Sequence, residues 1–101
     1  MDEKIFIGLI TYYRSIQDAR YFNEDSLKEL SDKAEVLLSK FEPLCQGYQM
    51  HINNIKTAIE NLRSARYYRG DKRKSAAFND GKIEITFSMD RLISAVREQL
   101  D

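Results

Sequence analysis

One short stretch of the chain concentrates basic and aromatic side chains. From Arg63 to Lys74 it reads Arg-Ser-Ala-Arg-Tyr-Tyr-Arg-Gly-Asp-Lys-Arg-Lys and holds six of the sixteen basic residues. Asp71 is its only acid, so the stretch carries +5, while the remaining residues carry −5 and the formal net charge is zero. Cationic side chains bind phosphates, and tyrosine rings stack on nucleobases. The chemistry that the stretch predicts is therefore the binding of a phosphate-bearing ligand.

We predict that eight residues of this stretch bind the ligand, six through charge and two through ring stacking. They are Arg63, Arg66, Tyr67, Tyr68, Arg69, Lys72, Arg73 and Lys74. The ligand is either a nucleotide or a nucleic acid, and no cofactor is expected. A purely structural interpretation also exists, because cations favour the C-termini of helices and tyrosines pack on neighbouring helices.

Two arginines of the stretch, Arg66 and Arg69, continue the apolar stripe of the helix before it. The apolar stripe of the preceding helix includes Ile59 and Leu62, and the same spacing continues to Arg66 and Arg69. Each guanidinium either leaves the end of the bundle with its stem buried or lines a cleft. In a cleft it needs an anion, because an unpaired buried charge is costly. Asp71 or a ligand phosphate can supply that anion.

Catalysis and metal binding are not expected from the sequence. The single histidine, His51, and the single cysteine, Cys45, lie on different sides of a helix and do not form a nucleophile–base pair. Zinc ligand sets, phosphate-binding loops and hydrolase motifs are missing. Asp80 and Gly81 match only the centre of a calcium loop, since three ligand positions lack side-chain oxygens. We therefore predict a non-enzymatic binding protein.

A second class of function competes with ligand binding. The basic stretch can also dock on an acidic surface of another protein. The chain would then be a small helical interaction module, such as a regulatory adaptor or an inhibitor from a mobile element. Salt separates the two classes, because nucleic-acid binding weakens steeply as salt rises.

The elements that must position the stretch are mostly helical. At 101 residues the chain has room for one domain, 1–101, with one core. Apolar residues recur at alternating spacings of three and four over Ile5–Ala19, Leu27–Phe41 and Tyr48–Leu62, which predicts three amphipathic helices. Pro43 predicts a break, with the third helix starting at or just after it. One long kinked helix is the alternative.

Cap residues predict where these helices begin and end. The first helix is expected to end near Tyr21 and Phe22, before a run of turn formers. Ser26 and Glu29 fit a capping box that opens the second helix. Gly70 fits a left-handed residue that ends the third helix.

After Gly70 the spacing of apolar residues changes from the helical period to a period of two. From Ile83 to Phe87 apolar and polar residues alternate, which is typical of a half-buried strand. Asn79–Gly81, just before it, has the composition of a hairpin turn. We therefore predict a short β-hairpin near 75–88 and a C-terminal helix capped by Ser88.

Together these patterns predict a mainly α fold, an antiparallel bundle of three helices followed by a small β-hairpin and a C-terminal helix. The first helix is apolar over more than one stripe, with Ile7 and Tyr13 beside the main one, so we expect a second packing partner and a homo-oligomer. The lone cysteine excludes an internal disulfide, and the N-terminal apolar run is too short for a membrane span. We expect a cytoplasmic protein that does not bind membranes.

Overall fold

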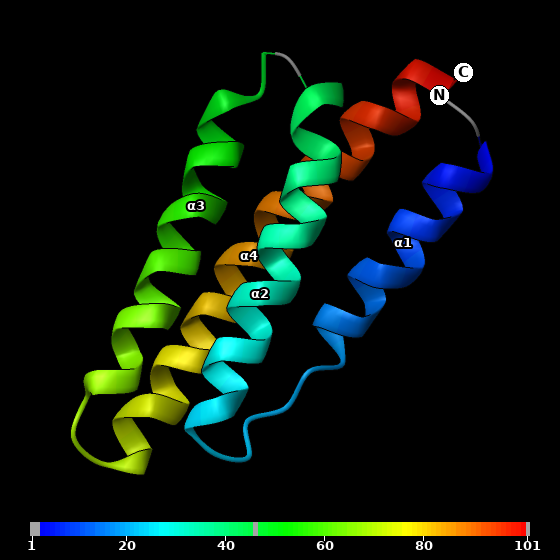
Figure 1. Ribbon diagram of the computed structural model, residues 1–101. Helices are drawn as coiled ribbons and strands as arrows, with labels where there is room; N and C mark the ends of the chain where they lie inside the picture. The colour runs from blue at the N-terminus through cyan, green and yellow to red at the C-terminus, as the bar shows by residue number, and fades with distance from the viewer. Residues whose placement is uncertain (1–2, 46, 101) are drawn as a thin grey trace.

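The computed structural model describes residues 3–45 and 47–100, which form four α-helices joined by short links (Figure 1). Within these residues no β-strand occurs and no helix combines the length and apolarity needed to cross a membrane. The mainly α prediction is confirmed. The helices are α1 (Glu3–Gln17), α2 (Glu24–Phe41), α3 (Gln49–Ser64) and α4 (Asp71–Leu100), with 3-10 turns at Glu42–Leu44 and Ala65–Tyr67.

The four helices form an elongated up-and-down bundle. Helices α2 and α4 lie between α1 and α3, which flank them on opposite sides (Figure 1). The bundle measures 47 × 23 × 16 Å. The α1–α2 and α3–α4 links lie together at one end, and the α2–α3 link lies at the other. The basic stretch is therefore placed at one end of the bundle, where α3 passes into α4.

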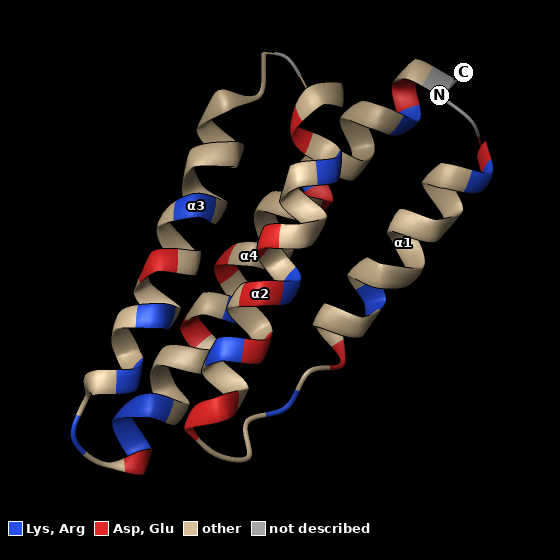
Figure 2. Cartoon of the chain, viewed as in Figure 1, with Lys and Arg blue, Asp and Glu red and all other residues tan. Residues whose placement is uncertain are grey.

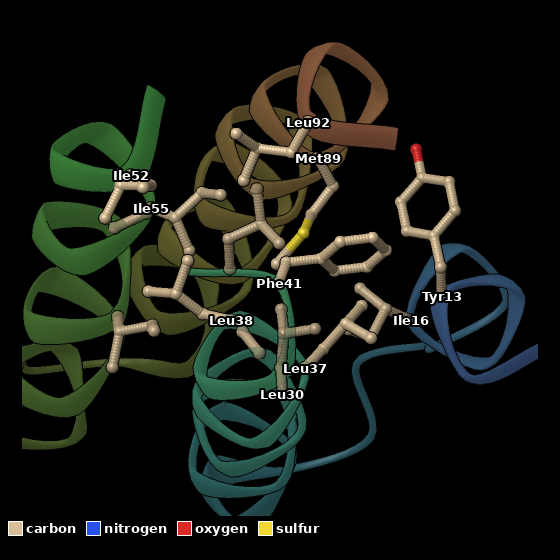
Figure 3. Packing of buried hydrophobic residues seen from close by; sticks show 14 of the residues in the cluster. Tyr13, Ile16, Leu30, Leu37, Leu38, Phe41, Ile52, Ile55, Met89 and Leu92 are labelled. Atoms are coloured by element: carbon tan, nitrogen blue, oxygen red, sulfur yellow. The ribbon is translucent and has the colours of Figure 1, made fainter. Parts of the chain in front are cut away.

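Apolar side chains from all four helices make one core. Around Phe41 of α2, Figure 3 shows Ile16 from α1, Ile55 from α3 and Met89 from α4. All four of these side chains are fully buried. Burial of a side chain of this size contributes about 1.5–3 kcal/mol. The core fixes the helices against one another and so holds the α3–α4 link in place.

The predicted β-hairpin near 75–88 is wrong, because these residues belong to the long helix α4. Ile85 points into the core with no exposed surface, whereas Ile83 and Phe87 are 65% and 55% exposed. The alternating apolar residues that predicted a strand are therefore one buried residue, Ile85, and two exposed ones, Ile83 and Phe87. Ser88 is a buried residue in the middle of α4 and caps nothing. The fully buried large apolar side chains of α4 repeat at helical spacings: Phe78, Ile85, Met89, Leu92 and Val96.

Gly81, a residue type typical of turns, lies inside α4 because of how α4 packs on α3. A Cβ atom at this position would lie 2.7 Å from Leu62 Cδ2 and 2.8 Å from Leu62 Cγ. The missing side chain therefore lets α3 and α4 approach closely. Glycine is needed here for packing between helices, and the sequence pattern of a hairpin turn concealed that role.

The start of α2 lies earlier than the predicted cap. Asn23 is the N-cap, and its Oδ1 accepts a hydrogen bond from the Asp25 N–H at 2.9 Å. The Ser26 Oγ accepts from the N–H groups of Phe22 at 2.9 Å and Asn23 at 3.3 Å. Ser26 thus serves as the third helical residue of a capping box whose cap is Asn23. The prediction that Ser26 itself caps α2 is wrong.

The break at Pro43 is confirmed, and the kinked-helix alternative is wrong. Helix α2 ends at Phe41, and Pro43 lies in the 3-10 turn that follows. The third helix nevertheless begins later than expected, at Gln49. Gly47, which has a φ of +93°, and the 3-10 turn occupy the space between the two helices.

Helix α1 is shorter than predicted and uses its broad apolar surface within the chain. It ends at Gln17 and buries Phe6, Leu9, Tyr13 and Ile16 against α2 and α4. The broad apolar surface of α1 is therefore covered by two helices of the same chain, α2 and α4. The remaining exposed residues, Ile5 and Ile7, are two positions apart and do not face the same side. Self-association stays a prediction, which sedimentation velocity can test.

Candidate ligand-binding turn and groove

The link between α3 and α4 is a tight turn built from a buried alanine and a left-handed glycine. Ala65 is fully buried, and its carbonyl oxygen accepts the Tyr68 N–H at 3.0 Å. Gly70 has a φ of +87°, as predicted, and its carbonyl oxygen accepts the Lys74 N–H at 3.3 Å. That hydrogen bond opens α4, so Gly70 precedes α4 and does not end α3. A residue with a side chain would be strained at this φ.

Arg66 and Arg69 lie on the exposed surface of this turn. The apolar stripe of α3 continues from Leu62 to the buried Ala65, and the two arginines fall outside it. The interpretation in which they line a buried cleft between helices of one chain is therefore wrong, and a cleft between subunits stays a prediction. Arg66 lines an open hollow of about 310 Å³ together with Lys28, Asp32, Arg63, Ser64 and Tyr67.

Two of the eight predicted site residues form ion pairs with α2. The Arg63 guanidinium contacts Asp32 Oδ1 at 3.3 Å and also the Glu35 carboxylate. Lys74 Nζ contacts Glu24 Oε2 at 3.0 Å. Hydrogen bonding to Lys74 lowers the pKa of Glu24, and hydrogen bonding to Glu35 raises the pKa of Arg63. These two cations connect helices and are already partnered.

Asp71, the only acid of the basic stretch, is held by a tyrosine. The Tyr21 hydroxyl donates a hydrogen bond to Asp71 Oδ1, which raises the pKa of Tyr21 to about 12. In the part of the chain that the structure describes, Asp71 forms no ion pair within 4 Å. The acid nearest in sequence to the basic residues therefore does not neutralise them.

The other predicted residues form an exposed surface that we call the cationic turn. It is made by Arg66, Tyr67, Tyr68, Arg69, Lys72 and Arg73, and Figure 2 shows the basic positions gathered where α3 passes into α4. Tyr67 is 86% exposed and Tyr68 is 45% exposed. Across residues 3–45 and 47–100, no ion pair within 4 Å includes any of the four cations. The fold leaves this charge available.

A hollow of about 650 Å³ begins at the cationic turn and runs between α3 and α4. We call it the α3–α4 groove. Small side chains open it, namely Ala58, Ala76, Ala77 and Gly81. Its polar lining consists of Asn61, Tyr68, Arg73, Asp80 and Glu84. None of these five side chains has a hydrogen-bond or ion-pair partner among the described residues.

Sequence reasoning missed Asn61, Asp80 and Glu84 as candidate site residues. Asp80 was interpreted as part of a hairpin turn, which removed it from any helical surface. Once α4 is read as a helix, Arg73, Asp80 and Glu84 recur at spacings of seven and four and share one side. The small residues Ala77 and Gly81, four apart, were the available signal for a hollow on that side.

A second groove, between α2 and α3, has a different character. Its volume is about 320 Å³, and its charged lining residues are Glu35, Glu42, Lys56, Glu60 and Arg63. Lys56 Nζ contacts Glu42 Oε1 at 2.8 Å, and Arg63 contacts Glu35. Four of these five charges are paired within the protein, whereas Glu60 forms no ion pair within 4 Å among the described residues.

Other reactive side chains do not form a site of their own. Cys45 is buried, its Sγ lies 3.9 Å from the Leu92 carbonyl oxygen, and burial raises the pKa of its thiol. A buried thiol of this kind is inert. Over the described ranges, no group of three or more His, Cys, Asp and Glu residues could hold a metal ion. The expectation that the protein is not an enzyme stays a prediction.

Comparison with known proteins identifies no relative. The chain matches no protein-family model, no curated protein and no solved structure. The cationic turn and the α3–α4 groove are the features of the molecule that bear on its function.

Proposed function

We propose that this protein is a non-enzymatic binder of single-stranded nucleic acid and that the cationic turn is its contact surface. The observation that carries the proposal is the combination of four cations without ion-pair partners and two exposed tyrosines within residues 66–73. Cations that are not paired within the protein can replace the counterions of phosphates. Exposed rings can stack on unpaired bases.

The shape of the turn favours an extended polyanion over a single nucleotide. Arg66 and Arg69 are exposed on the outside of the turn and do not converge on an enclosed cavity. A lone phosphate bound here would contact few of the cations, whereas a strand can contact several in succession. Tyr67, with 86% of its surface exposed, is open to a base that is not already stacked in a duplex.

Acidic residues limit where a strand can lie. Glu24 and Asp25 form the first turn of α2, and Glu24 reaches Lys74 beside the turn. Outside the basic stretch the chain carries a net charge of −5. Repulsion from these acids directs a polyanion to the cationic turn.

The test is a binding titration with a fluorescently labelled 12-nucleotide single strand, followed by anisotropy at several salt concentrations. Four phosphate contacts predict a slope of log affinity against log salt of about −3. We expect the double change Arg66→Glu and Arg69→Glu to weaken binding about a hundredfold. Circular dichroism should show unchanged helix content, because both side chains lie outside the core.

A matched control separates local from overall charge. Arg14→Glu with Lys40→Glu changes the net charge by the same amount, at exposed positions on α1 and α2. It should weaken binding far less. The proposal is contradicted if the strand does not bind at low salt, or if both double variants behave alike. A protein that ignores the strand but captures an acidic polypeptide would support the interaction-module alternative.

A further inference from the structure

We propose that the α3–α4 groove receives the base next to the cationic turn and selects bases that carry an exocyclic amino group, guanine above all. This inference rests on the proposed function. It adds a base-binding site and a sequence preference to a surface that otherwise recognises only phosphates and ring faces.

The groove and the cationic turn share two side chains. Tyr68 and Arg73 line the groove and also belong to the turn. Along α4, Arg73 and Asp80 are seven residues apart, which is about 10 Å of helix axis. A nucleotide whose phosphate contacts Arg73 can therefore extend its base past Tyr68 toward Asp80. A volume of about 650 Å³ falls within the range of small-molecule sites.

The far end of the groove offers hydrogen-bond acceptors. Asp80 and Glu84 lie one helical turn apart, and an ionised carboxylate only accepts hydrogen bonds. Guanine presents two adjacent N–H donors that match the two oxygens of one carboxylate. Adenine and cytosine present one amino group. Thymine and uracil flank their single N–H with two carbonyl oxygens, which the carboxylates repel.

The same carboxylates fix the direction of the ligand. A phosphate at the Asp80 end would meet two negative charges, whereas at the Arg73 end it meets a cation. The base therefore enters the groove and the backbone stays on the turn. Ala76 and Ala77 leave room for a flat ring, and Asn61 adds a donor and an acceptor on the α3 side.

The test compares four labelled 12-mers of thymidine in which the three central nucleotides are thymidine, adenosine, cytidine or guanosine. We expect the full-length protein to bind the guanosine strand about tenfold more tightly than the all-thymidine strand, with adenosine and cytidine between them. Equal affinity for all four strands would overturn this inference while leaving the proposed function intact. Failure to bind any strand would instead overturn the proposed function.

Two variants test whether the groove carries the preference. Asp80→Asn with Glu84→Gln keeps the shape of the lining and removes its charge, so the preference for guanosine should disappear. Ala76→Leu fills the groove at an exposed helical position and should also remove the preference, with all-thymidine binding retained. The control, Glu29→Gln with Glu98→Gln, makes the same charge change elsewhere on the surface. A preference that survives both groove variants contradicts the proposal.

Discussion

The α2–α3 and α3–α4 grooves carry similar charged residues but pair them to different degrees. In the α2–α3 groove, Lys56 pairs with Glu42 and Arg63 pairs with Glu35. In the α3–α4 groove, Arg73, Asp80 and Glu84 have no ion-pair partner among the described residues. The presence of charge therefore does not by itself mark a site. A functional surface is indicated where the fold leaves the charge unpaired.

Helix packing explains this difference. Glu35 of α2 and Glu42 of the following 3-10 turn lie opposite Arg63 and Lys56 of α3, so four of the five charges of the α2–α3 groove are paired. Exposed pairs of this kind contribute at most about 1 kcal/mol each. At the α3–α4 groove four of the lining residues are small, namely Ala58, Ala76, Ala77 and Gly81. The missing side chain at Gly81 lets Leu62 of α3 pack closely against α4.

The largest expected effect concerns the contact that sets the α3–α4 groove. Leu62 is 1% exposed, and Leu62→Ala should destabilise the protein by about 2–5 kcal/mol. Gly81→Ala alone should also destabilise it, by about 1 kcal/mol, because overpacking against Leu62 outweighs the gain in helix propensity. In the Leu62→Ala background the same change should become stabilising. Urea unfolding of the unchanged protein, the two single variants and the double variant measures this double-mutant cycle. Additive changes in the free energy of unfolding would show that the contact between Gly81 and Leu62 does not set the spacing of α3 and α4.

A smaller effect concerns the paired charges around α2. Hydrogen bonding to Lys28, with Arg63 contributing, lowers the pKa of Asp32 from 3.8. A carboxylate whose pKa is lower in the folded state adds stability that is present above its unfolded pKa and is lost as the pH falls through the folded value. Tm should therefore fall slightly less between pH 5 and pH 2 in Asp32→Asn than in the unchanged protein. Parallel curves would show that this ion pair contributes nothing.

Much of the fold could be predicted from the sequence because most apolar stripes are read directly from their spacing. The first half of α4 could not, since the sequence does not show that Ile83 and Phe87 face solvent while Ile85 is buried. Gly81 strengthened the error, because its partner Leu62 lies on another helix.

The candidate site, too, could be predicted from the sequence only in part. The concentration of cations and tyrosines is local and is read directly from the sequence, but it lies in the α3–α4 link and the first turn of α4, because α3 ends at Ser64 and not at Gly70. Which cations are already paired is not local, because Asp32 is 31 residues from Arg63 and Glu24 is 50 residues from Lys74. The groove exists only after α3 and α4 pack, and sequence reasoning therefore missed Asp80 and Glu84.

The central claim, that unpaired rather than paired cations bind the ligand, is tested most directly by two matched double variants of the basic stretch. Arg69→Ala with Arg73→Ala removes two unpaired cations, and Arg63→Ala with Lys74→Ala removes two paired ones. The measurement is the slope of log affinity against log salt for the labelled single strand. We predict that the first variant reduces the magnitude of the slope by about 1.4 and that the second leaves it unchanged. Equal slopes for the two variants, or a larger loss in the second, would contradict the account.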